Sequence, residues 1–66
     1  MLEMMRELWG KGYHFVETGY YGESDVEDFE QVEDSYEEAE EEEFLTFEVE
    51  IDHEAQTVTY WVEDDE

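Results

Sequence analysis

The side chains of this sequence that could do chemistry are carboxylates. Between Glu23 and Glu43, 13 of 21 residues are Asp or Glu and none is Lys or Arg. On a helix face, carboxylates three or four residues apart repeat every ~5 to 6 Å, close to the spacing of phosphates along a nucleic-acid strand. This segment is therefore predicted to present a rod of negative charge that could stand in for a phosphate backbone.

Other kinds of chemistry have no support in the pattern. His14 and His53 are isolated from each other, there is no cysteine, and no spacing resembles a zinc site, an EF-hand loop or a Gly-rich phosphate loop. No two carboxylates are marked out as an acid and base pair held in a cleft. We therefore expect no catalytic residue, no metal ligand and no cofactor, and we do not expect an enzyme.

The charge of the chain restricts its partners. Its 66 residues contain 24 Asp or Glu and two Lys or Arg, which gives a formal net charge of −22. Direct binding to nucleic acid or to an anionic membrane relies on basic residues and is excluded by sign. A basic protein is the expected partner. No apolar run is long enough for a signal peptide or a membrane span, and with no cysteine this favours a cytoplasmic protein.

The acidic segment has the features of a helix with a defined start. Ser24 is a good N-cap, Glu27 completes a capping box, and the helix is predicted to begin at Asp25. Its apolar residues are spaced by three and four, which gives one packing stripe and leaves the other faces to carboxylates. The stripe consists of Val26, Phe29, Val32, Tyr36 and Ala39.

The remaining elements predict a single α+β domain over residues 1–66. A short helix is expected from Leu2 to Trp9 with Gly10 as its C-cap, followed by a strand that ends at Thr18. Alternating apolar residues predict two further strands, over residues 45–51 and 57–62. The expected fold is an antiparallel sheet of about three strands with two helices, in the order α-β-α-β-β. The paired Tyr20 and Tyr21 fit either a core or a contact surface.

Part of the chain resembles the phage-encoded uracil-DNA glycosylase inhibitors, which are DNA-mimic proteins that occupy the DNA cleft of the enzyme. In that family a Gly-Lys pair ends the first helix, a strand carries a Glu-Ser pair, and after a gap of six residues an acidic helix opens with alternating Glu and Val. The corresponding residues here are Gly10-Lys11, Glu17-Thr18 and Asp25–Phe29, without a gap in register. The similarity covers residues 10–29, about a third of the chain.

The resemblance implies a set of polar contacts with the enzyme. Glu17 would correspond to the strand-end carboxylate that enters the cleft, and Thr18 to its hydroxyl neighbour. Asp25, Glu27 and Asp28 would be helix carboxylates that stand for phosphates.

The resemblance also implies an apolar pocket, lined by Tyr21, Val26 and Phe29, that captures the leucine with which the glycosylase wedges into DNA. The chain departs from the family at Gly19, where the family has an apolar residue. It also has two further strands where the best-known member has more, so that a smaller sheet or a homodimer would have to compensate.

Two other functions fit the same composition. The chain could be a DNA mimic directed at a restriction or CRISPR nuclease or at a histone-like protein. It could also be an acidic chaperone that shields basic proteins without a defined site.

Overall fold

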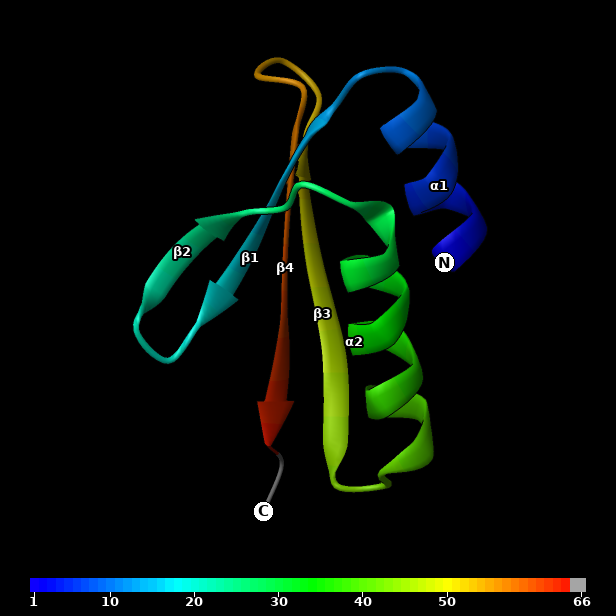
Figure 1. Ribbon diagram of the computed structural model, residues 1–66, viewed down its shortest axis with the longest axis vertical. Coiled ribbons are helices and arrows are strands. Elements are labelled where there is room, and N and C mark those ends of the chain that lie inside the picture. The colour runs from blue at the N-terminus through cyan, green and yellow to red at the C-terminus, as the bar shows by residue number, and fades with distance from the viewer. Residues whose placement is uncertain (65–66) are drawn as a thin grey trace.

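The computed structural model describes residues 1–64, in which two helices pack on one face of a four-stranded sheet (Figure 1). The predicted α+β class is confirmed. In chain order the elements are α1 (Leu2–Gly10), β1 (His14–Gly19), β2 (Gly22–Asp25), α2 (Phe29–Glu41), β3 (Leu45–Asp52) and β4 (Thr57–Asp64).

The sheet has one more strand than the sequence predicted, and it is mixed rather than antiparallel. The strand order is β2-β1-β4-β3, with β1 and β2 antiparallel, β3 and β4 antiparallel, and β1 and β4 parallel in the centre. The chain crosses from β2 through α2 to β3 before β4 returns beside β1. A crossover of this length is what allows two strands to run parallel. The element order is therefore α-β-β-α-β-β.

The start of α2 also differs from the prediction. Ser24 is not a helix cap, because it lies in β2, opposite Glu17 of β1. The helix begins at Phe29 instead, and its N-cap is Asp28, whose Oδ1 accepts a hydrogen bond from the Glu30 backbone N–H at 3.1 Å. The backbone N–H and C=O groups of residues 22–25 form hydrogen bonds with β1, so they are not free to form the first turn of a helix at Asp25. The helix therefore starts four residues later.

Alanine substitution should distinguish these two candidate caps. We expect Asp28→Ala to lower the free energy of unfolding by ~1 kcal/mol, because a helix N-terminal N–H loses its acceptor. Ser24→Ala, on an exposed edge strand, should change it by less than about 0.5 kcal/mol. Urea unfolding followed by circular dichroism measures both values. A larger loss for Ser24→Ala would contradict the observed helix start.

The first helix also ends later than expected. Gly10 is its last residue, Lys11 is the C-cap, and Gly12 takes the left-handed conformation at φ +91°. The Lys11 backbone N–H donates to the carbonyl oxygens of Glu7 and Leu8, both at 3.1 Å. The glycine that the helix end requires is therefore Gly12 and not Gly10.

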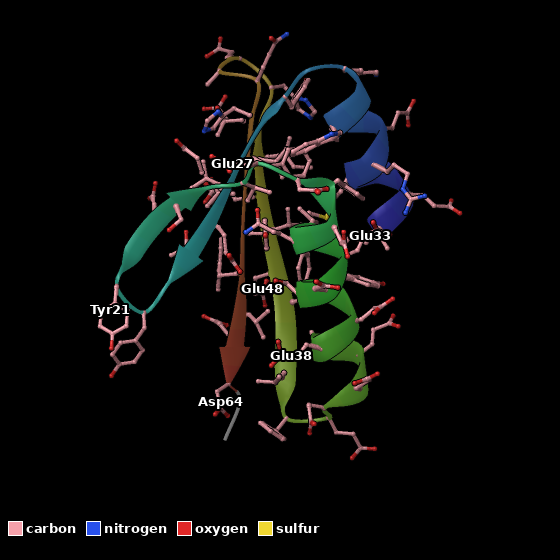
Figure 2. The ribbon with its side chains drawn as sticks, in the orientation of Figure 1. Tyr21, Glu27, Glu33, Glu38, Glu48 and Asp64 are labelled. Atoms are coloured by element: carbon pink, nitrogen blue, oxygen red, sulfur yellow. The ribbon has the colours of Figure 1, made fainter. Side chains whose placement is uncertain are left out.

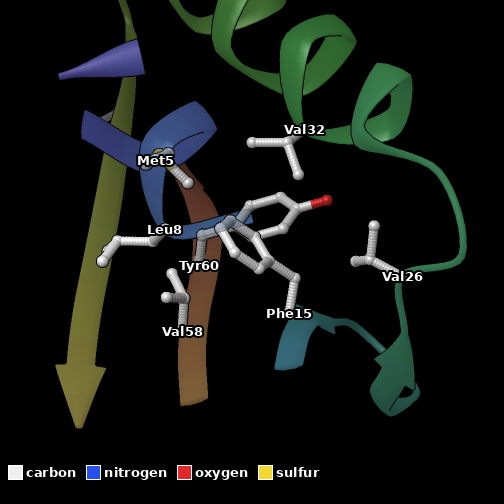
Figure 3. Close-up of a cluster of buried hydrophobic side chains, with 7 residues drawn as sticks. All are labelled: Met5, Leu8, Phe15, Val26, Val32, Val58 and Tyr60. Atoms are coloured by element: carbon white, nitrogen blue, oxygen red, sulfur yellow. The ribbon is translucent and has the colours of Figure 1, made fainter. Parts of the chain in front are cut away.

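The core lies between the helices and the sheet. In β3 and β4 the predicted alternation is confirmed, since Ile51 pairs with Val58 and Val49 with Tyr60 on the face that the helices cover. Met5 and Val32 reach this face from the two helices, and both are fully buried. Figure 3 shows the buried cluster, which consists of Met5, Leu8, Phe15, Val26, Val32, Val58 and Tyr60.

Candidate functional site

The carboxylates of α2 surround a surface hollow. Side chains with carboxylates follow this helix over its length (Figure 2). The hollow has a volume of about 430 Å³ and opens to solvent. Its lining residues are Asp28, Phe29, Glu30, Glu33, Asp34 and Glu37. Five acidic residues around one apolar ring form a site suited to a cationic group with an apolar stem, such as arginine or lysine of a basic partner.

Arg6 of α1 occupies the edge of this site. Its Nη2 lies 2.7 Å from Glu33 Oε2, and its guanidinium carbon is 5.5 Å from the centre of the Phe29 ring. Both charged side chains are substantially exposed, so the pair adds less than ~1 kcal/mol to stability. No pattern in the sequence predicts this contact, which joins residues 27 positions apart. The contact shows that one arginine can bind Glu33 and lie over the Phe29 ring at the rim of the hollow.

The two predicted residues of β1 point to opposite faces of the sheet. Glu17 is half-buried, and its Oε1 accepts a hydrogen bond from the Ser35 hydroxyl of α2 at 3.2 Å. This carboxylate is therefore turned toward the helix rather than toward a partner. Thr18 is half-buried on the other face, opposite Glu23 of β2.

The three predicted helix carboxylates do not share a helix. Asp25 lies in β2 and its Oδ1 is 2.8 Å from His14 Nε2. Glu27 is exposed in the connection to α2, and its backbone N–H donates to the Gln31 side chain at 3.3 Å. Only Asp28, through its position at the N-cap, lines the hollow. The prediction of acidic residues at the start of α2 thus identified one member of the site and missed those on the next two turns.

The predicted apolar pocket is not assembled. Val26 belongs to the buried core, and Phe29 is half-buried with its ring centre 5.7 Å from that of Trp9 and 6.1 Å from that of Phe15. Tyr21 lies instead at the tip of the β1–β2 hairpin, fully exposed. The fold therefore uses Val26 and Phe29 for packing and leaves Tyr21 outside.

A second set of carboxylates lies on the face of the sheet that the helices leave open. Glu48 pairs with Trp61 and Glu50 with Thr59, and these residues alternate with the core residues of β3 and β4. The period-two pattern of the sequence predicts this exposed side for both glutamates. Negative charge is thus present on both sides of the molecule, although only α2 combines it with a hollow.

Two tyrosine hydroxyls have altered acidity. A hydrogen bond with the Glu40 carboxylate, together with its charge, raises the pKa of Tyr36. Burial raises the pKa of Tyr60 to about 12, and the nearby Glu17 carboxylate adds to the effect. The Tyr60 hydroxyl is buried and has no hydrogen bond of good geometry among the described residues, although the Ser35 side chain lies close enough to oppose the rise in its pKa. A buried, unsatisfied hydroxyl is a cost to folding that only the tertiary structure reveals.

Removal of this hydroxyl should stabilise the protein. We expect Tyr60→Phe to raise the free energy of unfolding by ~1 kcal/mol or more, because the ring stays in the core and the unpaired polar atom is lost. In the parent, the folded state holds the phenol proton above pH 10 while the unfolded state releases it. Stability should therefore fall as the pH rises from 10 toward 12, by no more than about 1.4 kcal/mol per pH unit.

Urea unfolding between pH 8 and pH 11.5 measures this effect in both proteins. The free energy of unfolding of Tyr60→Phe should fall less than that of the parent above pH 10, because the variant has no phenol to titrate at this position. Parallel alkaline profiles for the two proteins would contradict the assignment.

Over residues 1–64, no group of three or more His, Asp or Glu side chains is arranged to hold a metal ion. Within the same range, neither helix has the length and apolar character needed to cross a membrane. His53 has a local structural contact, since its Nδ1 lies 3.0 Å from the Tyr13 hydroxyl.

The fold and the site together define a small acidic α+β protein with a carboxylate-lined hollow on one helix. Comparisons of the chain with protein-family models, with curated proteins and with solved structures each give no match.

Proposed function

We propose that this protein is a DNA-mimicking inhibitor, which occupies the DNA-binding groove of a basic enzyme with its carboxylates in the place of phosphates. The observation that carries the proposal is the acidic hollow of α2. Its carboxylates come from successive turns of one helix, at positions 30, 33, 34 and 37. A basic groove that evolved to contact a regular row of phosphates has the complementary charge.

The packing of α2 supports this proposal, because a mimic needs its charges to be held in place before binding. Val32 is fully buried under the helix, and the Tyr36 ring lies 5.4 Å from the Phe47 ring of β3. These contacts fix the orientation of the helix, so that little conformational entropy is lost when the carboxylates engage a partner. The long-range field of the chain would increase the rate of encounter with a basic protein.

Uracil-DNA glycosylase is the first target to test, because of the similarity at residues 10–29. In this proposal Asp28 and the carboxylates of α2 replace the phosphates, and the inward position of Glu17 assigns that residue to the scaffold. A restriction or CRISPR nuclease is the alternative target in the same class.

The test measures uracil excision from a labelled duplex oligonucleotide at increasing ratios of protein to glycosylase, near physiological ionic strength. We expect complete inhibition near a 1:1 ratio. In parallel, displacement of labelled DNA is measured for a restriction endonuclease and a Cas nuclease. If the glycosylase keeps full activity at excess protein but labelled DNA is displaced from a nuclease, the nuclease is the target and DNA mimicry is retained. Displacement from none of these enzymes would overturn the proposal.

One observation favours a second function, that of an acidic shield for basic proteins. Carboxylates also lie on the open face of the sheet, at Glu48 and Glu50, and a shield needs charge on every side. A shield should bind many basic proteins with similar affinity and release them as salt rises past the screening range. A DNA mimic should keep one partner at moderate salt.

A further inference from the structure

The β1–β2 hairpin ends in two adjacent tyrosines that the fold does not use. Tyr20 is 99% exposed and Tyr21 is 101% exposed. Their rings contact each other, with centres 5.8 Å apart in an edge-to-face arrangement. Figure 2 shows Tyr21 at the end of the hairpin, away from both helices. Such an exposed aromatic pair is costly in water and is typical of residues that bind a partner.

The turn itself does not require tyrosine. Gly19 pairs with Gly22, and Gly22 supplies the positive φ of the turn at +118°. Neither tyrosine has a positive φ, since Gln56 is the only non-glycine residue with one among residues 1–64. Most residue types therefore fit at positions 20 and 21, and polar turn formers would keep the hairpin soluble. The identity of these two residues has no explanation in folding.

Carboxylates accompany the aromatic tip. Glu23 and Asp25 follow it on β2, where all four residues are exposed. No Lys or Arg occurs between Lys11 and the end of the chain. The β1–β2 hairpin thus carries two aromatic rings at its turn and negatively charged side chains along β2. An extruded nucleotide has the same combination, an aromatic base joined to a backbone with a phosphate on each side.

We propose that the Tyr20–Tyr21 tip occupies the site where the partner holds a nucleobase that has left the base stack. This inference rests on the proposed function and narrows the partner to enzymes that extrude a base. Their pockets hold the base between aromatic or apolar side chains next to groups that bind the backbone, and tyrosine rings can fill such a site. The hollow on α2 would contact the phosphate-binding groove, and the tip would provide the anchor that slows dissociation.

The test uses three purified enzymes that bind an unstacked base, namely a uracil-DNA glycosylase, a cytosine DNA methyltransferase and a deaminase that acts on cytosine in single-stranded DNA. A restriction endonuclease that reads stacked duplex is the fourth enzyme. Dissociation constants are measured by displacement of fluorescein-labelled oligonucleotides. The double variant Tyr20→Ser/Tyr21→Ser keeps the charge of the parent. Tyr20→Phe/Tyr21→Phe keeps the rings, and Phe44→Ser removes a different exposed ring, 43% exposed, next to the start of β3. Thermal melting should be unchanged in both tip variants.

We expect the serine variant to bind a base-extruding enzyme about 10- to 100-fold more weakly than the parent, mainly through faster dissociation. The phenylalanine variant and Phe44→Ser should stay within about threefold of the parent. Equal binding by parent and serine variant would overturn the inference and leave DNA mimicry intact, as would displacement from the restriction endonuclease alone. Displacement from none of the four enzymes would overturn the inference. Displacement from neither these enzymes nor the Cas nuclease would overturn the proposed function as well.

Discussion

Replacing Phe15 with alanine should cost ~3 to 5 kcal/mol of folding free energy, the range for a buried phenylalanine. Phe15 is 1% exposed, and its ring centre lies 5.2 Å from that of Trp9 and 6.1 Å from that of Phe29. These rings lie on α1, β1 and α2. The cavity left by the alanine would therefore weaken the packing of all three elements. A domain of this size has a total stability of about 3 to 10 kcal/mol. The variant should therefore lose a large fraction of its stability at 25 °C.

Circular dichroism and urea unfolding measure this loss, and Phe44→Ala is the matched control. Phe44 has the same side chain but is 43% exposed and lies outside the buried cluster. Its replacement should change stability by less than about 0.5 kcal/mol. Equal losses for the two variants would contradict the assignment of Phe15 to the centre of the core.

Neutralising the carboxylates of the hollow should have the largest effect on partner binding. The variant Glu30→Gln, Glu33→Gln, Asp34→Asn and Glu37→Gln removes four negative charges and keeps the side chains similar in size. We expect its association rate with a basic DNA-binding enzyme at low salt to fall by 10-fold or more, because electrostatic steering raises such rates by about 10- to 1,000-fold. The dependence of the rate on salt should become weaker.

A second variant removes the same number of charges from other parts of the surface. Gln replaces Glu48 and Glu50 on the open face of the sheet, Glu54 in the turn before β4, and Glu63 near the end of β4. If α2 carries the binding site, stopped-flow association rates should fall much less in this control. Equal losses in the two variants would show that net charge alone governs binding and would favour the acidic shield.

The local patterns of the sequence determined much of the fold. The alternation in residues 45–51 and 57–62 predicted β3 and β4 with the correct faces, because side chains of a strand alternate between its two sides. The stripe of Phe29, Val32 and Tyr36 predicted the packing face of the acidic helix in the same way. The carboxylate-rich outer face of that helix also followed from composition and period, but of the individual residues predicted for the site only Asp28 and Phe29 line the hollow.

Only the tertiary structure decided how the segment from Gly22 to Asp28 is used. Ser24 and Asp28 are both good caps, and local preference could not choose between them. The choice came from hydrogen bonds with a distant strand, since residues 22–25 pair with β1 and the Val26 N–H donates to the Phe15 carbonyl oxygen at 3.0 Å. The same pairing moved Val26 into the core and left Tyr21 at an exposed tip.

The parallel pairing of β1 with β4 likewise could not be predicted from local sequence patterns. It joins His14 to Thr57 and Glu17 to Tyr60, residues about 43 positions apart, and no periodicity within either strand records which neighbour it will have. Burial of the Tyr60 hydroxyl beside Glu17 follows from that contact. Periodic side-chain patterns specify faces, because faces depend on local geometry. The choice of partner strand and of the exact helix start depends on backbone hydrogen bonds that form only when the whole sheet assembles.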